Sequence, residues 1–252
     1  MGSRYAQWSP AAPLRRWVEC VWVRENAELP AHRQLVVPDG CVDLVWWEGR
    51  VEVVGPDRGP RGVPVGGGAG IAGVRFRPGS AGLLLGRVPV REVCDLQVPL
   101  EEVLPGVARP LTERLVGAEQ PRAAAAVLDA FAVSLLRGYV PDPSVERAVA
   151  LLGRPEGVAV SAVAAELGLS VRHLRRRVTD AVGYGPKTLH GVLRFRRALS
   201  WARSGEAGLA EVALRAGYAD QAHFTREVRR LAGAPPTLLL GGSREVQPDS
   251  SS

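Results

Sequence analysis

The sequence predicts an α+β N-terminal domain with a small antiparallel sheet, followed by an all-α C-terminal domain with two helix-turn-helix units joined by a linker helix. Three observations support this prediction: a proline-rich break, a charge difference between the two sides of that break, and an internal repeat after it. A chain of 252 residues suits two domains of ordinary size, and 46% apolar residues are enough for a hydrophobic core in each.

The break is Pro141-Asp142-Pro143, because two closely spaced prolines disfavour helix and stop the preceding element. Before the break, an apolar stripe predicts a helix over 122–137, which either pairs two copies of the chain or packs against its own domain. The stripe consists of Val127, Leu128, Phe131 and Leu135. The predicted parts are a sensor or regulatory domain over 1–118, a linker helix and break over 119–143, a helical domain over 144–240 and a disordered tail over 241–252.

The net charge of +6 lies entirely after the break. Residues 1–143 hold 16 Lys+Arg and 16 Asp+Glu, whereas residues 144–252 hold 16 Lys+Arg and 10 Asp+Glu. A basic part beside a neutral one indicates a module that binds a polyanion next to a domain with another role. Lys187 is the only lysine, and such an arginine bias also arises in GC-rich genomes, so arginine content alone is not evidence for DNA binding.

In the N-terminal part, short apolar runs separated by turn residues predict strands at 41–47, 51–54 and 71–77. Short helices are expected around 80–86, 99–105 and 107–117. The chain has no apolar run of about 18 residues that would span a membrane, and its first residues lack the apolar core of a secretory signal. We therefore expect a cytoplasmic protein with no membrane partner.

The three cysteines, Cys20, Cys41 and Cys94, have no spacing typical of a metal site or a redox dithiol. They are interpreted as buried, reduced thiols. A regulatory thiol or soft-metal site built from all three is the alternative, and it would need the fold to bring them together.

The internal repeat lies in the basic part, with one copy at 160–186 and the other at 209–236. Gly168 matches Gly217 at a spacing of 49 residues, and Ser170 matches Asp220 at a spacing of 50. Each copy has the pattern of a helix-turn-helix, with a glycine that ends the first helix and a side-chain oxygen that caps the second. The second helices, over 170–179 and 220–230, are the predicted recognition helices.

In each recognition helix, apolar residues face the core and the intervening residues face outward. The outward residues are Arg172, Arg175 and Arg176 in the first helix and Gln221, Ala222, Thr225 and Arg226 in the second. Arginine can donate two hydrogen bonds to guanine, and glutamine can pair with adenine, so these side chains suit the major groove. A linker helix over 188–203 would hold the two units about 34 Å apart, as two successive major grooves require.

Residues 144–240 resemble the DNA-binding domain of the AraC family of transcription regulators. The resemblance rests on the linker segment 193–199, the second-unit stretch from Val212 to Arg226, and the closing Gly233 and Pro236. It implies a sequence-specific DNA-binding regulator, with base contacts from Arg172, Arg175, Arg176, Gln221, Thr225 and Arg226. The implied partners are double-stranded DNA and, as candidates, a small-molecule effector, RNA polymerase and a second copy of the chain.

Residues 30–100 resemble an uncharacterised domain that accompanies AraC-type units, through Val37-Pro38-Asp39-Gly40 and the segment 73–79. The resemblance to the AraC family implies that this N-terminal domain senses a ligand or mediates dimerisation. Five of the six tryptophans lie in the first fifth of the chain, where they form either a core or the wall of a ligand cavity. The expected cavity residues are Trp46, Asp43 and Arg75, which would hold a small aromatic or anionic ligand.

Two alternatives to a promoter-binding regulator follow from the same residues. One is a DNA-targeted enzyme of the repair type, which would need a metal-activated cysteine cluster that the three cysteines do not form by spacing. The other is a protein-interaction module that uses the N-terminal domain. The sequence shows no Ser/His/Asp group and no paired acids, so we expect no catalytic residues, no cofactor and no metal site.

Overall fold

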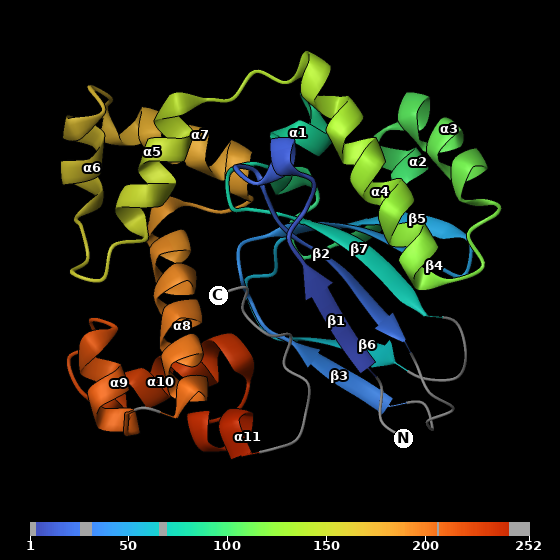
Figure 1. The fold of residues 1–252 in the computed structure, drawn as a ribbon. Helices are drawn as coiled ribbons and strands as arrows, with labels where there is room; N and C mark the ends of the chain where they lie inside the picture. The colour runs from blue at the N-terminus through green and yellow to red at the C-terminus, as the bar shows by residue number, and fades with distance from the viewer. Residues whose placement is uncertain (1–3, 26–31, 66–69, 206, 242–252) are drawn as a thin grey trace.

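The computed structural model describes residues 4–25, 32–65, 70–205 and 207–241. Figure 1 shows a sheet-based N-terminal part beside a helical C-terminal part, with the long helix α8 (Pro186–Ser204) running between the two ends of the helical part. The predicted fold class, α+β followed by all-α, is confirmed. Among the described residues, no helix is long and apolar enough to cross a membrane.

The N-terminal part is built on a six-stranded antiparallel sheet with the order β1-β2-β7-β4-β5-β8. Its strands are β1 (Arg4–Trp8), β2 (Val18–Glu25), β4 (Val42–Trp47), β5 (Arg50–Val54), β7 (Ile71–Phe76) and β8 (Gln97–Pro99). A separate two-stranded ribbon pairs β3 (His32–Val36) with β6 (Arg61–Val65) in antiparallel fashion. The expected strands at 41–47, 51–54 and 71–77 correspond to β4, β5 and β7, whereas the other five strands were not predicted.

Strand alternation gives the central sheet two different faces. On β4, Val42, Leu44 and Trp46 join the main hydrophobic cluster, while Asp43 and Val45 lie on the opposite face. The turn into β5 has positive φ at both Glu48 (49°) and Gly49 (77°), the backbone of a tight two-residue hairpin. The register of this hairpin, with Trp47 opposite Arg50, sets which β5 residues share each face.

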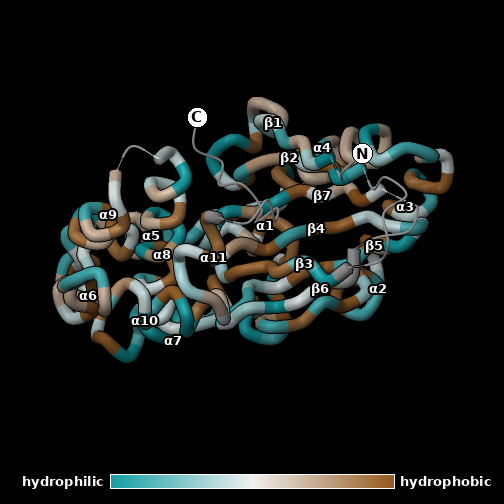
Figure 2. The backbone as a smooth tube through the Cα atoms, turned by 90° about the horizontal axis from the view of Figure 1, so that it is seen from below, coloured by the Kyte–Doolittle hydropathy of each residue, from teal (hydrophilic) through white to brown (hydrophobic). Residues whose placement is uncertain are grey.

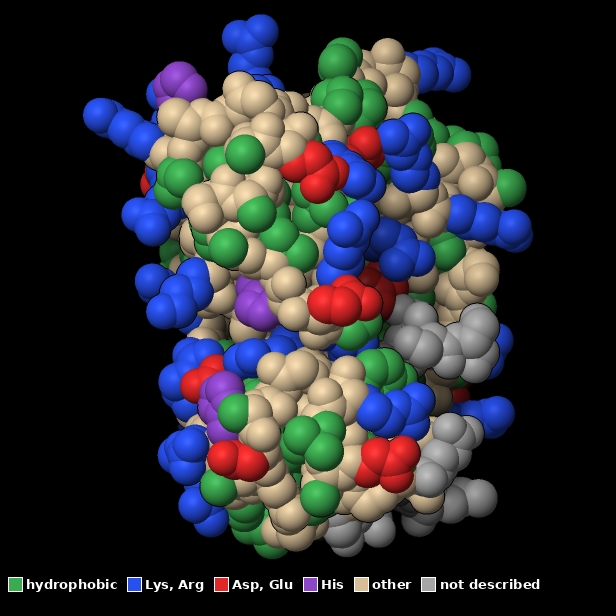
Figure 3. Space-filling model, turned by 90° about the vertical axis from the view of Figure 1, so that its left-hand side faces the viewer, with side chains coloured by type: hydrophobic (Ala, Val, Ile, Leu, Met, Phe, Trp, Pro, Cys, Tyr) green, Lys and Arg blue, Asp and Glu red, His purple; other side chains and the backbone are tan. Residues whose placement is uncertain are grey.

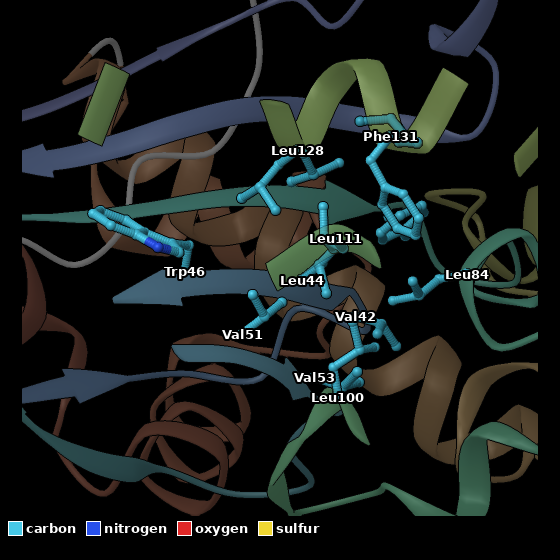
Figure 4. Close-up of a cluster of buried hydrophobic side chains, with 14 of the residues drawn as sticks. Val42, Leu44, Trp46, Val51, Val53, Leu84, Leu100, Leu111, Leu128 and Phe131 are labelled. Carbon is cyan, nitrogen blue, oxygen red and sulfur yellow. The ribbon is translucent and has the colours of Figure 1, made fainter. Parts of the chain in front are cut away.

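Helices cover one face of the central sheet. They are η1 (Ala12–Leu14), α1 (Gly82–Leu85), η2 (Val90–Glu92), α2 (Leu100–Val103), α3 (Pro105–Leu115), α4 (Pro121–Leu135) and η3 (Leu136–Gly138). Figure 4 shows Leu128 and Phe131 of α4 directed at Leu44 and its neighbours on the sheet. The apolar stripe on α4 therefore packs against its own domain, and it is not free to pair two copies of the chain.

The C-terminal part consists of helices only. They are α5 (Pro143–Leu152), α6 (Val160–Glu166), α7 (Val171–Val182), α8, α9 (Leu209–Arg215), α10 (Gln221–Ala232) and α11 (Pro236–Gly241). The proline-rich break is also the start of α5, because Asp142 accepts hydrogen bonds from the backbone N–H groups of Ser144 (3.0 Å) and Val145 (3.3 Å) and Pro143 occupies the first turn. One hydrophobic cluster runs through all of α5 to α11. Except for Gly241, the tail expected over 241–252 lies outside the described residues.

Candidate nucleic-acid interface and inter-sheet cavity

The first helix-turn-helix unit consists of α6 and α7. Gly168 in the turn has a φ of 64°, a left-handed conformation that favours glycine. The hydroxyl of Ser170 accepts a hydrogen bond from the backbone N–H of His173 (3.2 Å), which caps α7 as expected. Leu174 and Val178 of α7 are buried in the shared core. Local sequence signals thus position this helix, and its outer face is left exposed.

The second unit repeats the arrangement with α9 and α10. Asp220 accepts a hydrogen bond from the backbone N–H of His223 (2.6 Å), and Phe224 and Val228 are fully buried. Gly217 has a φ of 80°, and a Cβ atom added there would lie 2.6 Å from the carbonyl oxygen of Pro155. Glycine is therefore required at Gly217 both by the backbone conformation and by the close approach of another chain segment.

Three arginines on α7 present free guanidinium groups to solvent. Arg172, Arg175 and Arg176 are exposed, and within the described parts of the chain none of them has an acidic partner. The next residue, Arg177, differs because it forms an ion pair with Asp142 (2.9 Å). The three unpaired arginines need not break an existing ion pair to bind a polyanion.

The outer face of α10 has a different character. Gln221 and Arg226 are exposed and Thr225 is half-buried, whereas Arg230 is tied to Glu227 (3.0 Å). Figure 2 shows α7 and α10 along the same edge of the helical part. In the space-filling view of Figure 3, Lys and Arg side chains follow one edge of the molecule from top to bottom. The outer faces of α7 and α10 both carry exposed arginines along the shared edge of the helical part. That α7 and α10 are separated by the length of one DNA turn, about 34 Å, stays a prediction.

The N-terminal domain has a cavity of about 170 Å³ between the central sheet and the β3–β6 ribbon. Two of the three residues expected to hold a ligand, Asp43 and Arg75, line this cavity. They form a buried ion pair with each other, because the guanidinium of Arg75 donates to both carboxylate oxygens of Asp43 at 3.1–3.2 Å. The indole N–H of Trp22 donates to the same carboxylate (2.9 Å).

The placement of Trp46 differs from the expectation. Its side chain lies on the helix-covered face of β4, in the hydrophobic core with Leu44 and Leu128, as Figure 4 shows. The tryptophans that line the cavity are Trp22 and Trp47. Because neighbouring residues of a strand point to opposite faces, Trp46 and Trp47 could not both line it. The sequence pattern did not indicate which face would be covered by helices.

The three cysteines are unpaired, with Cys20 and Cys41 buried and Cys94 half-buried. Burial raises the pKa of Cys20 to about 12 and that of Cys94 to about 11, so both thiols are protonated at neutral pH. The thiol of Cys41 donates to the carboxylate of Glu19 (3.5 Å). In the described ranges, no group of three or more His, Cys, Asp or Glu side chains is arranged to hold a metal ion.

Asp57 lines the cavity beside Arg61, whose Nε donates to its carboxylate at 3.0 Å. Burial outweighs this pairing and raises the pKa of Asp57 to about 6. The folded carboxyl thus retains a proton at pH values where the unfolded one, with an ordinary pKa of about 3.9, has released it. Ionising Asp57 therefore disfavours the folded state, and the wild-type protein loses stability from this group as pH rises from about 4 to about 6.

We expect Asp57→Asn to remove this contribution. Between pH 4 and pH 7, the variant should gain roughly 3 kcal/mol of unfolding free energy relative to the wild type, because a pKa difference of one unit corresponds to about 1.4 kcal/mol. Urea unfolding of both proteins across this pH range measures the difference. A constant offset between the two curves would show that Asp57 titrates normally in the fold.

Two family models match the chain. Residues 6–99 match "Domain of unknown function (DUF6597)", and residues 163–240 match "Helix-turn-helix domain". The HTH-type transcriptional activator RhaS of Escherichia coli is 35% identical over 69 residues, which are 27% of this chain and 25% of that protein. The chain therefore matches only a quarter of the length of this curated relative.

Two solved structures are similar to larger parts of the chain. The C-terminal domain of AraT, a response regulator from Geobacillus stearothermophilus, has 24% identity and a TM-score of 0.38, over 40% of this chain and 85% of that one. ToxT from Vibrio cholerae O395 has 11% identity and a TM-score of 0.48, over 88% of this chain and 95% of that one. Both TM-scores are below 0.5.

Proposed function

Because the chain carries an AraC-type helix-turn-helix domain at its C-terminus, behind a domain of the DUF6597 family, we propose that it is a sequence-specific DNA-binding transcription regulator. The observation that carries the proposal is the outer face of α7, where Arg172, Arg175 and Arg176 are exposed and have no acidic partner in the described parts of the chain. Arginine side chains on a helix that enters the major groove can each bind a guanine edge with two hydrogen bonds.

In this proposal α7 and α10 read two successive major grooves. Arg172, Arg175 and Arg176 make the contacts of the first unit, and Gln221, Thr225 and Arg226 make those of the second. The N-terminal domain over 1–118 modulates binding through an effector, and the helical domain over 144–240 carries the DNA contacts. Because α4 packs on its own sheet, we assign residues 119–135 to the N-terminal domain.

A second copy of the chain and RNA polymerase stay candidate partners. A dimer would need a surface other than the stripe on α4, since that stripe is covered by the central sheet. A DNA-targeted enzyme has no observation in its favour: the described residues show no metal cluster, and burial raises the pKa of the Cys20 and Cys94 thiols, which makes them poor nucleophiles.

Selection from a library of random DNA duplexes with the full chain tests the proposed function. We expect enriched sequences with two short half-motifs about 10 base pairs apart, the spacing of adjacent major grooves on one DNA face. Binding that shows no enriched sequence and disappears steeply as salt rises would mean that only phosphates are contacted. That result would contradict a sequence-specific regulator.

Arg176→Ala tests the predicted base contact of the first unit. We expect a loss of roughly 1–3 kcal/mol in DNA binding, or about 5- to 150-fold in affinity, together with relaxed specificity at one base pair. The measurement is the Kd for the selected duplex and for each of its single-base variants. Arg109→Ala is the matched control, because its side chain is 86% exposed on α3 in the other domain. A uniform loss across all variants would show that Arg176 binds phosphate instead.

A further inference from the structure

The cavity between the central sheet and the β3–β6 ribbon has apolar walls on both sides. Trp22, Val45, Trp47 and Ile71 line it from the central sheet, and Val36 and Val63 are among the lining residues on the ribbon. Its volume of about 170 Å³ is close to that of apolar cavities that take up benzene. The space and the aromatic walls thus suit a planar molecule of one or two rings.

Space for this cavity depends on how the aromatic side chains are placed. Trp22 lies flat against Gly73 of the neighbouring strand β7, where an added Cβ atom would come within 2.4 Å of the indole ring. The indole N–H of Trp22 is fixed by Asp43. A glycine and a hydrogen bond together hold this tryptophan against the sheet, and so keep the cavity open.

Each aspartate that lines the cavity is compensated by an arginine. Asp39 and Asp43 share Arg75, and Asp57 pairs with Arg61, whereas the third lining arginine, Arg24, lies over the ring of Tyr5. Asp43 and Asp39 lie 3.1 and 3.5 Å from Arg75, and Asp57 lies 3.0 Å from Arg61. A charged ligand that binds to these groups would have to separate one of the pairs and leave its partner uncompensated inside the protein, which is costly. The cavity therefore favours an uncharged occupant.

One segment of the chain connects the cavity wall with both helix-turn-helix units. In the segment 55–61, Gly55, Asp57 and Arg61 line the cavity, while the two prolines between them face the helical part. A Cβ atom added at Gly183 would lie 2.8 Å from Cγ of Pro56, and one added at Gly233 would lie 3.3 Å from Cγ of Pro60.

Gly183 and Gly233 are equivalent positions of the repeat, 50 residues apart, and each ends the recognition helix of its unit with a positive φ. Pro56 and Pro60 therefore lie against equivalent positions of the two units, Pro56 at the first and Pro60 at the second. A second connection runs to α8, where Arg196 donates to the carbonyl oxygen of Asp39 (3.1 Å) and to the carboxylate of Glu19 (2.6 Å). The cavity wall is thus attached to both units and to the helix between them.

We propose that this cavity binds a small, uncharged aromatic molecule and that the segment 55–61 transmits its binding to both helix-turn-helix units at once. The ligand fills the space between the central sheet and the β3–β6 ribbon. It thereby restricts the movement of the segment at Gly55, Asp57 and Arg61, which line the cavity. Pro56 and Pro60 then hold the ends of α7 and α10 in one relative position. This proposal rests on the proposed DNA-binding function, for which it specifies the class of effector and the route of regulation. Ligand binding itself and its effect on the two helix ends do not require that function.

The binding step is tested with three probes that share one ring system and differ in charge: naphthol, naphthoate and naphthylmethylammonium. Calorimetry on the full chain at neutral pH should show one site for naphthol, and affinities for the two ions that are about 10-fold weaker or more, since each ion must break a compensated pair. Tighter binding of either ion than of naphthol would overturn the assignment of an uncharged ligand.

Val36→Trp fills the cavity from the ribbon side and should weaken naphthol binding by about 100-fold or more. Val116→Trp is the matched control, because Val116 is 82% exposed, and it should bind as the wild type does. Val63→Trp fills the same space from β6, and far-UV circular dichroism checks that each variant is folded. Unchanged naphthol binding in a folded cavity variant would place the ligand elsewhere and overturn the site.

The transmission step is measured by amide hydrogen exchange without DNA, so that it does not depend on the proposed function. Saturation with naphthol should slow exchange near Gly183 and Gly233 by about threefold or more in the wild type, as ordering of a segment does. A variant with both Pro56→Ala and Pro60→Ala should keep naphthol binding and lose this protection. Protection of only one of the two positions, or of neither, would overturn the link to both units. Failure of the duplex selection alone would contradict the DNA-binding function and leave these outcomes intact.

Discussion

Replacing Asp43 with alanine should lower the free energy of unfolding by about 3–5 kcal/mol, because the change leaves a buried arginine without its main partner. Arg75 is 7% exposed, and it donates to Asp43 through both Nε and a terminal nitrogen at 3.1–3.2 Å. The same substitution removes the acceptor for the indole N–H of Trp22. Asp39, at 3.5 Å from Arg75, is too distant to replace these hydrogen bonds. Urea unfolding of the full chain measures the loss.

A matched control shows how much stability is lost when an exposed ion pair is broken instead of a buried one. Glu113→Ala breaks the exposed pair between Arg109 and Glu113 on α3 and should cost less than about 1 kcal/mol. The double variant Asp43→Leu with Arg75→Leu should recover much of the loss, since it removes both charges from the interior. If Asp43→Ala costs no more than Glu113→Ala, water must reach the Arg75 guanidinium and the pair is not buried in solution.

The helical part was predictable in detail because its determinants are local. Ser170 and Asp220 were expected as helix caps, and both accept the backbone N–H three residues later. The predicted recognition helices, 170–179 and 220–230, correspond to α7 and α10, which extend two to three residues further. Each capping residue acts within one helical turn of its own position. Its effect can therefore be predicted without knowledge of the rest of the fold.

The sheet was less predictable because its pairing is not local. The ribbon joins β3 to β6, which are separated by both strands of the intervening hairpin. Almost every residue of β2 is buried, so its sequence shows little of the alternation that marks a half-exposed strand. Three strands of the central sheet were expected from their turn residues, whereas β1, β2 and β8 depend on partners far along the chain.

The cavity shows the same limit at the level of single residues. Asp43 and Arg75 were expected as separate ligand anchors, but their register on adjacent strands makes them partners. Alternation alone predicts that Trp46 and Trp47 lie on opposite faces. Only the position of α4, set by contacts with β2, β4 and β7, decides that Trp46 belongs to the core. The sequence therefore indicated two polar residues that line the cavity, whereas their pairing depends on the strand register.

Phe224→Ala should destabilise both helix-turn-helix units together, by about 3–5 kcal/mol, because it removes a large side chain from a core that the units share. Phe224 is fully buried, its ring lies 5.1 Å from that of Tyr218, and its hydrophobic cluster includes Leu174 of α7 and Phe195 of α8. A cavity at this position removes contacts from the second unit directly. It also weakens the packing of α8, against which the first unit rests.

Amide hydrogen exchange and urea unfolding of the full chain measure this loss. Exchange should become faster in Val171–Val182 as well as in Gln221–Ala232, since both helices contribute to one cluster. Thr225→Ala, the neighbouring half-buried position, should change stability by less than about 0.5 kcal/mol. Faster exchange confined to α10 would mean that the two units unfold independently. In that case α8 would not hold them in a fixed relation, and the spacing of two successive major grooves would have to be imposed by the DNA.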